Sequence, residues 1–137
     1  MPDHAAFRDL LRSLAHDRAR VLVGGTFARK LYGEAAEVTD YVLWYDCDGD
    51  NAERVLRALT RIGAPVDGVS ANDLCSPDYA FRYGDGDGEI RLVGGMDGVA
   101  FEDAWETRLE THIENGTTLR VIGRETLRAL ELAARVR

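Results

Sequence analysis

The stretch VLVGGTFARKLYGEAAEVTDYVLWYD, residues 21–46, decides the fold of this chain. It opens with an apolar run, residues 21–23, whose branched side chains favour a short buried strand. The run ends in Gly24, Gly25 and Thr26. Glycine allows a tight turn with close backbone approach, and a threonine oxygen is a good cap for a helix N-terminus. We therefore expect a strand, a glycine turn and a helix with Thr26 as its cap.

The helix is predicted to be short, because Gly33 is well placed to end it. A second strand is predicted over residues 38–45, and side chains alternate between the two faces of a strand. One face would carry Asp40, Val42, Trp44 and Asp46, and the other Thr39, Tyr41, Leu43 and Tyr45. Tyr41 and Tyr45 would meet a protein partner if that side of the sheet is uncovered.

The rest of the chain alternates between helix and strand patterns. Further helices are predicted over residues 4–17, from residue 50 or 51 to Gly63, around residues 101–105 and over residues 124–136. Further strands are predicted over residues 79–83 and 89–93 and in a hairpin of residues 109–113 and 118–122 turned at Asn115-Gly116, while residues 73–77 are expected to be a turn. This order predicts an α/β or α+β fold, a mixed sheet flanked by helices, in one domain of residues 1–137.

Length and composition narrow the classes of function. The chain has 137 residues, and 45% of them are apolar, which suits one domain with a real core. Its formal net charge is −7, with no run of Lys or Arg, so general nucleic-acid binding and membrane binding are disfavoured. The N-terminus does not read as a signal peptide, and a cytoplasmic location is expected. Cys47, Cys75 and the three histidines are scattered, so no metal or other cofactor is predicted.

An ordered series of motifs resembles the nucleotidyltransferase-fold superfamily, in particular small bacterial domains related to minimal nucleotidyltransferase antitoxins. The series comprises the Gly24-Gly25-Thr26 turn, the strand Thr39-Asp40-Tyr41-Val42-Leu43-Trp44, the helix of residues 51–63, Ile90-Arg91-Leu92-Val93, Asp97-Gly98-Val99, Phe101-Glu102-Asp103-Ala104-Trp105 and the ending at residues 122–134. The resemblance covers nearly the full length and implies a cleft between the glycine turn and the strand of Asp40.

In active members of this superfamily the glycine turn holds a triphosphate, and three acidic residues hold Mg²⁺, two of them alternate on one face of a strand and the third on a neighbouring strand. The resemblance assigns the first acid to Asp40, but Val42 stands at the second position and Arg91 at the third. Mg²⁺ requires hard oxygen ligands, and a guanidinium beside the ion costs on the order of several kcal/mol at the effective dielectric of a protein. The resemblance therefore implies a degenerate site without a metal.

Glu131 is a further departure, because relatives of this type often have lysine at the matching place on the last helix. Leu127, Leu130 and Ala134 share a helical stripe with Glu131, so its carboxylate is expected to point inward. Arg91 is the predicted partner of this acid. The alternative is that both side chains extend into solvent at the edges of their elements.

Three functions remain as alternatives. The favoured one is a cleft repurposed to bind a small molecule, or to convert it by metal-free acid–base chemistry, with Asp40, Glu131 and Arg91 as catalytic residues and Gly24, Gly25, Thr26, Val42 and Trp44 as ligand-binding residues. The second is a non-catalytic pseudoenzyme that binds a protein partner or a second copy of itself, as antitoxin-like relatives do. The third is residual Mg²⁺-dependent nucleotidyl transfer. An open apolar cavity with Asp40 or Glu131 on its wall would favour the first.

Overall fold

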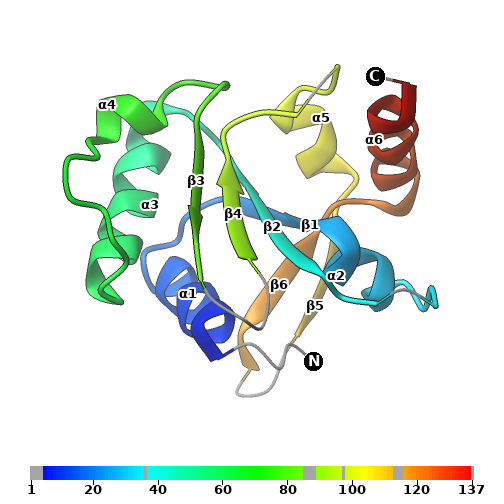
Figure 1. Ribbon diagram of the computed structural model, residues 1–137, viewed down its shortest axis with the longest axis horizontal. Helices are drawn as coiled ribbons and strands as arrows, with labels where there is room; N and C mark the ends of the chain where they lie inside the picture. Colours follow the sequence, from blue (N-terminus) through cyan, green and yellow to red (C-terminus); the bar gives the residue numbers. More distant parts are fainter. Residues whose placement is uncertain (1–4, 36, 85–88, 97, 113–115, 137) are drawn as a thin grey trace.

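The computed structural model describes residues 5–35, 37–84, 89–96, 98–112 and 116–136. The helices in these ranges are α1 (Ala5–His16), α2 (Gly25–Leu31), α3 (Gly49–Arg61), α4 (Ala71–Leu74), α5 (Phe101–Glu106) and α6 (Arg124–Val136). The strands are β1 (Val21–Gly24), β2 (Asp40–Tyr45), β3 (Ala80–Tyr83), β4 (Glu89–Val93), β5 (Leu109–His112) and β6 (Thr118–Val121) (Figure 1). Every predicted helix and strand is present, although β2 begins at Asp40 and not at residue 38.

The strands form one mixed sheet in the order β3-β4-β2-β1-β6-β5. Neighbours in sequence pair antiparallel, namely β1 with β2, β3 with β4, and β5 with β6, whereas β2 with β4 and β1 with β6 are parallel. The central strand β2 thus has β1 on one side and β4 on the other. This arrangement confirms the predicted α+β fold with a mixed sheet.

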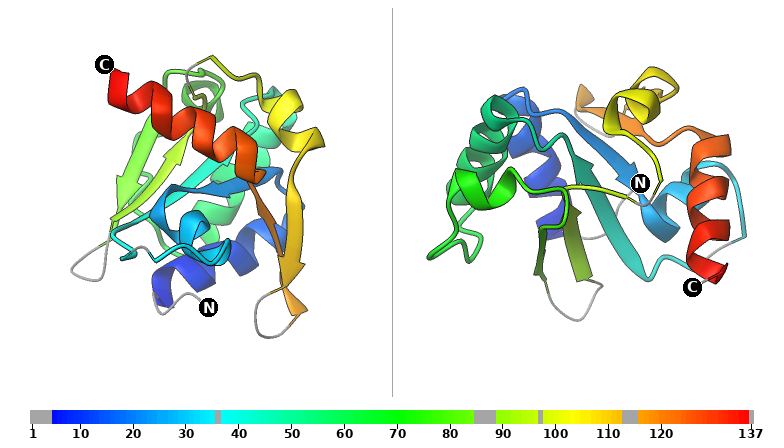
Figure 2. Two further views of the ribbon diagram at one scale, coloured as in Figure 1. Left: turned by 90° about the vertical axis from the view of Figure 1, so that its right-hand side faces the viewer. Right: turned by 90° about the horizontal axis from the view of Figure 1, so that it is seen from above.

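Helices cover both faces of the sheet (Figures 1 and 2). On one face α1 and α3 pack together, and the ring of Phe7 in α1 lies 4.6 Å from that of Tyr41 in β2. On the other face α5 and α6 cover β2, where Phe101 of α5 meets Trp44 edge-on at 5.4 Å. Because side chains alternate along β2, one set packs in the apolar layer under α1 and α3, and the other set packs in the layer under α5 and α6.

The structure corrects two expectations away from the main site. Tyr41 and Tyr45 are 5% and 0% exposed beneath the helical layer, so they offer no aromatic surface to a partner. The first two residues of the turn expected at residues 73–77 belong to the short helix α4, which a capping box between Ser70 and Asp73 begins. Asn115, the predicted hairpin turn residue, lies outside the described residues.

None of the helices in the described part of the chain combines the length and apolar character that a membrane span requires.

Asp17, directly after α1, ties α1 to α3. Its side chain is 6% exposed and accepts hydrogen bonds from both terminal nitrogens of Arg61, at 2.6 and 2.9 Å. Nearby, the Ser13 hydroxyl donates to the carbonyl of Ala58 at 2.8 Å. The hydrogen bonds from Arg61 hold the pKa of Asp17 below its ordinary value, although desolvation of the carboxylate acts in the opposite direction.

We predict that Asp17→Asn lowers the free energy of unfolding at pH 7 by about 1–2 kcal/mol, the worth of hydrogen bonds to a charged group. Because the folded-state pKa is depressed, this stabilisation is complete above the unfolded-state pKa of about 3.9 and is lost as the pH falls through the folded-state value. Urea unfolding at pH 7 and at pH 3 should show the gap between wild type and variant narrowing at the lower pH.

The matched control for this prediction is Asp9→Asn, which breaks an exposed pair with Arg12 at 3.5 Å. Exposed pairs contribute little to stability, so this variant should unfold almost as the wild type does. A gap for Asp17→Asn that is equally wide at both pH values would contradict the assignment.

Candidate functional site

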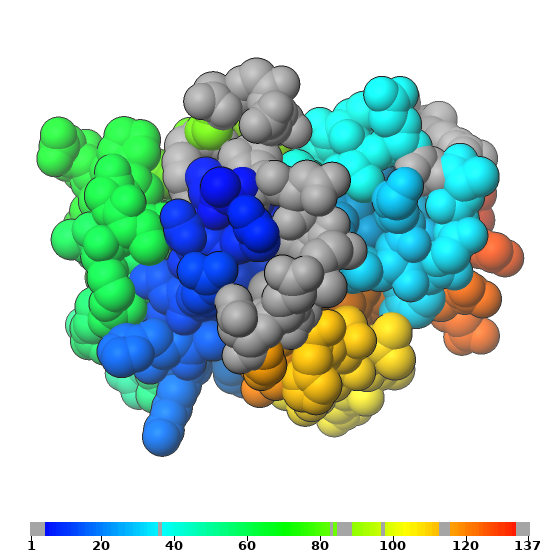
Figure 3. Space-filling model, turned by 90° about the horizontal axis from the view of Figure 1, so that it is seen from below, coloured from blue at the N-terminus to red at the C-terminus, as the bar shows by residue number. Residues whose placement is uncertain are grey.

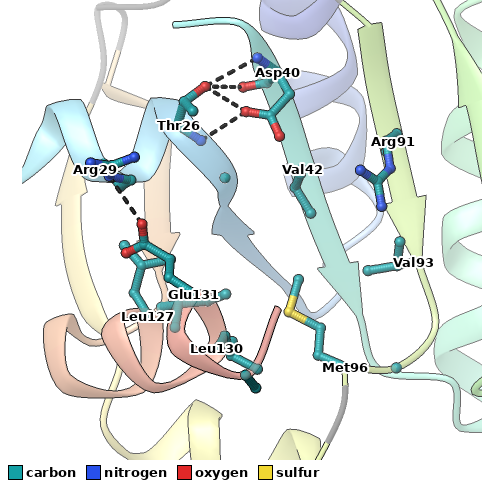
Figure 4. A pocket seen from close by; sticks show the side chains of 14 residues that line it. Thr26, Arg29, Asp40, Val42, Arg91, Val93, Met96, Leu127, Leu130 and Glu131 are labelled. Carbon is teal, nitrogen blue, oxygen red and sulfur yellow. Dashed lines mark hydrogen bonds and ion pairs between the residues drawn. The ribbon is translucent and has the colours of Figure 1, made fainter. Parts of the chain in front are cut away.

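An open cavity of about 400 Å³ lies between α2, β2, β4 and α6 (Figure 4). Six residues predicted for the site line it, namely Gly25, Thr26, Asp40, Val42, Arg91 and Glu131. The remaining lining residues are Arg29, Val93, Gly95, Met96, Ile122, Leu127, Leu130 and Ala133. Gly24 and Trp44, which were predicted to bind the ligand, are not part of the lining.

Thr26 and Asp40 are joined by hydrogen bonds where α2 and β2 begin (Figure 4), and we call this pair the lock. The backbone N–H of Thr26 donates to Oδ1 of Asp40 at 2.8 Å, and the Thr26 hydroxyl donates to the same oxygen. The hydroxyl oxygen in turn accepts the backbone N–H groups of Thr39 and Asp40, at 2.9 and 3.1 Å. The prediction that Thr26 caps α2 is therefore wrong. Gly24 is the N-cap residue and makes no side-chain cap bond, and the carboxylate of Asp40 satisfies the orphan N–H at the helix start instead.

Asp40 keeps one oxygen for a ligand. Its Oδ2 accepts no hydrogen bond from the residues that the structure describes, and Figure 4 shows it on the cavity side of the lock. A carboxylate oxygen in this position can accept a hydrogen bond or a proton from a bound molecule.

Gly25 forms the corner at which the chain turns from β1 into α2. Its φ of +69° lies in the left-handed region, and a Cβ atom there would lie 2.9 Å from Cγ2 of Val42 and 3.1 Å from Oδ1 of Asp40. Only glycine fits this corner without strain. Gly24 is restricted as well, because a Cβ on it would come within 2.9 Å of Cδ1 of Ile122, a residue of the cavity wall.

Glu131 is paired with Arg29, and the prediction that it pairs with Arg91 is wrong. Nε of Arg29 lies 3.1 Å from Oε2 of Glu131 (Figure 4). The same Nε lies 3.1 Å from Oε1 of Glu34. Arg29 follows Thr26 by one helical turn and therefore faces the same side of α2, which brings it to α6. Arg91 belongs to β4, on the opposite wall of the cavity. The carboxylate of Glu131 does lie at the cavity, as the helical stripe predicted.

Arg91 is the cation of the opposite wall. It lies in register with Val42 across the parallel β2–β4 pair, so the two side chains share a face of the sheet. The residue is half-buried, and its Nε is buried without a hydrogen-bond partner among the described residues. A buried donor without an acceptor costs about 1–3 kcal/mol. The cavity thus contains a guanidinium with unused hydrogen-bonding capacity.

The rest of the cavity wall is largely apolar. It is formed by Val42, Val93, Met96, Ile122, Leu127 and Leu130 (Figure 4). Trp44 lies further along the same face of β2, but Phe101 of α5 covers it and its side chain is 1% exposed. The cavity therefore ends between Val42 and Trp44, where Phe101 of α5 packs against the indole.

No protein-family model matches this sequence, and neither a curated protein nor a solved structure matches the chain. The site must be interpreted from its own chemistry. Among the described residues, no group of three His, Cys, Asp or Glu side chains is placed to hold a metal ion. The charged groups at the cavity are the locked Asp40, the Arg29–Glu131 pair and Arg91.

Sequence reasoning missed Arg29 and the wall residues from the loop after β4. The spacing from Thr26 to Arg29 was a usable signal, because it places both on one side of α2. Gly95 and Met96 carried no comparable signal, since a loop has no periodicity. Leu127 and Leu130 were on the stripe predicted to point inward, and they do line the cavity.

Gly25→Ala should lower the free energy of unfolding by about 2–4 kcal/mol, because it adds left-handed backbone strain to a clash with Val42 and Asp40. The matched control is Gly33→Ala, where φ is +84° but no atom lies within 4 Å of an added Cβ. That variant has the backbone strain alone, at about 1 kcal/mol. Urea unfolding of the two variants measures the difference, and equal losses would show that the corner at Gly25 is not crowded.

Proposed function

We propose that this chain binds a small organic anion with an apolar body in the cavity between α2, β2, β4 and α6. The observation that carries the proposal is the guanidinium of Arg91, which stands in a largely apolar wall with a buried and unpaired Nε. In this interpretation the chain is a nucleotidyltransferase-like domain whose metal-binding wall has been changed into a wall for an anion.

The unused hydrogen-bonding capacity of Arg91 supports an anionic ligand. Arg29 is already neutralised by Glu131 and Glu34, and Asp40 keeps its negative charge although its Oδ1 is occupied by Thr26. Arg91 has no comparable partner among the described residues. A ligand carboxylate can take two parallel hydrogen bonds from a guanidinium, which recovers the desolvation cost of the unpaired donor.

Size and lining support a small ligand with apolar mass. A cavity of about 400 Å³ lies within the range of small-molecule sites, in which apolar walls supply affinity and a few polar groups set the orientation. The leucines of α6 and Val42 and Val93 of the sheet would contact the body of the ligand, while Arg91 holds its anionic group.

The same arrangement supports metal-free acid–base conversion of the ligand as an extension of the proposal. Oδ2 of Asp40 would accept a proton from the ligand and return it, and Arg91 would stabilise the negative charge that develops. The alternative of a partner-binding pseudoenzyme has less support, since the tyrosines of β2 that would favour it are buried. A cytoplasmic location remains part of the proposal.

Binding is tested with phenylpropanoate and its neutral isostere phenylpropanamide at constant ionic strength. The carboxylate should raise the melting temperature and the amide should not, because ligand binding stabilises the native state. Arg91→Met should weaken carboxylate binding by about tenfold or more, equivalent to ~1.4 kcal/mol, without lowering the stability of the free protein, because it removes an unpaired buried donor.

Arg82→Met is the matched control for Arg91→Met. Arg82 is the direct partner of Arg91 in the β3–β4 pair, but its side chain is 61% exposed and outside the cavity. Its replacement should leave carboxylate binding unchanged. Equal binding of acid and amide would contradict the proposal, and stabilisation by ATP with Mg²⁺ would favour residual nucleotidyl transfer instead.

Conversion is tested separately with phenylpyruvate, whose C3 protons are acidified by the neighbouring keto group, by following their exchange in D₂O by NMR. Asp40→Asn keeps an Oδ1 acceptor for Thr26 but removes the proton-accepting carboxylate. We expect this variant to bind the carboxylate while its exchange rate falls by about 100-fold, the lower range for loss of a general base. Exchange at the wild-type rate would exclude Asp40 as the proton acceptor.

A further inference from the structure

A second cavity, of about 510 Å³, lies at the C-terminal end of α1 and shares no lining residue with the first. Its polar and aromatic lining comes from three segments: the loop before β1, α5, and the start of β6. The residues are Arg18, Arg20, Trp105, Thr117, Thr118 and Arg120. Figure 3 shows the face of the molecule on which α1, in dark blue, lies above the β5–β6 hairpin in yellow and orange.

The described side chains that line this cavity carry positive charge, although the whole chain has a net charge of −7. It contains three arginines and two threonines, and no acidic side chain from the described part of the chain. Asp46, Glu102 and Glu110, which lie outside the lining, pair with Arg20 and Arg120. Arg18 is the lining arginine without an ionic partner among the described residues, and its charge suits an anionic ligand.

The guanidinium of Arg20 is held in place by ion pairs and stacking, so it has no hydrogen-bonding capacity left for a ligand. Its terminal nitrogens lie 2.9 Å from Asp46 and 2.8 Å from Glu102, and its guanidinium stacks on Trp105 at 4.5 Å from the ring centre. The guanidinium of Arg108 lies 4.2 Å from the same ring centre, and the ring of Phe101 stacks on it at 5.7 Å. These contacts hold the indole in place at the edge of the cavity.

Arg120 provides unused donors. Its guanidinium lies 5.5 Å from the ring centre of Trp105, and its Nε is buried without a hydrogen bond among the described residues. That Nε is the atom that faces Glu110, 3.5 Å from Oε2 of its carboxylate. The donors left for a ligand oxygen are therefore the two terminal nitrogens of Arg120, which have no hydrogen bond or ion pair among the described residues.

Arg18 occupies a backbone position that favours glycine. Its φ is +58°, and it is the only described residue other than glycine with a positive φ. The hydrogen bonds from Arg18 N–H to Ala15 and from Ala19 N–H to Leu14 form the left-handed end of α1 at which glycine is preferred. The side chain of Arg18 has no hydrogen bond or ion pair with the described residues and borders the cavity. A strained arginine without a structural partner suggests a role outside the fold.

We propose that this second cavity binds a small molecule through a phosphoryl group, which Arg18 and Arg120 hold from opposite segments. A phosphoryl group accepts more hydrogen bonds than a carboxylate, which matches two guanidinium groups and the hydroxyl of Thr117. The hydroxyl of Thr118 already lies 3.3 Å from Nδ1 of His112. Trp105 borders the cavity, so its indole reports on binding there. The net charge of −7 disfavours a polyanion such as nucleic acid, so the ligand is a free phosphate or a compact phosphate monoester.

The test uses inorganic phosphate, phenyl phosphate and benzoate, titrated at constant ionic strength. Trp44→Phe leaves Trp105 as the single tryptophan, so its fluorescence reports on this cavity. We expect saturable binding of phenyl phosphate, tighter than benzoate by about tenfold or more. Binding of phenyl phosphate no tighter than of inorganic phosphate would assign the site to free phosphate. If Trp44→Phe does not fold, the amide NMR signals of Gly116, Thr117 and Thr118 in the wild-type chain give the same readout.

Two variants separate a binding role from a structural one. Arg120→Gln should weaken phosphate binding by about tenfold, and Arg12→Gln, on the exposed side of α1, should leave it unchanged. Arg18→Gly should weaken binding as well and yet raise the melting temperature by roughly 2–5 °C, because it relieves the left-handed strain. Replacing a residue that has only a structural role would not weaken phosphate binding and raise the melting temperature at the same time.

The proposal is overturned if none of the probes shifts Trp105 or the Thr117 and Thr118 amides, if benzoate binds as well as phenyl phosphate, or if Arg18→Gly and Arg120→Gln bind as the wild type does. It is also overturned if Arg91→Met abolishes the phosphate response, since the anion would then lie in the first cavity. Failure of carboxylate binding at Arg91 leaves this result unaffected, so the two proposals are tested independently.

Discussion

The lock between Thr26 and Asp40 is the interaction on which the geometry of the first cavity depends. One hydroxyl and one carboxylate oxygen satisfy the start of α2 and the start of β2 together. β2 is the central strand, and its register with β4 places Arg91 beside Val42. The position of Asp40 therefore determines where the helix begins, and it also determines where the guanidinium lies relative to the helix.

This lock changes the chemical role of Asp40. A metal-binding carboxylate needs its oxygens free for the ion, whereas here one oxygen serves the backbone of α2. Val42 and Arg91 on the same wall offer no oxygen ligand to a divalent cation. The pairing of Arg29 with Glu131 neutralises the other acid at the cavity, which leaves Arg91 and Oδ2 of Asp40 as the charged groups with unused capacity.

Local signals predicted the fold, and tertiary contacts decided the site. Gly33, for example, ends α2 because the left-handed residue after a helix is a local requirement. The sequence could not show that Asp40 would take the N–H of Thr26, since the two residues meet only across the β1–β2 corner. Nor could periodicity choose between Arg29 and Arg91 as the partner of Glu131. The helices that cover Tyr41 and Trp44 were equally hidden, because alternation along a strand does not reveal which helices cover each face.

The net charge of −7 makes arginine desolvation the decisive factor at both cavities. The net negative charge of the whole molecule repels anions. At about 0.1 M salt this repulsion is largely screened at distances beyond about 10 Å. Attraction must therefore come from contact, where a half-buried guanidinium with an unmade hydrogen bond gains most from an oxyanion. Such a balance disfavours polyanions, which would meet the repulsive surface along their length. It favours ligands with one compact anionic group and an apolar body, and both cavities provide walls for such a body.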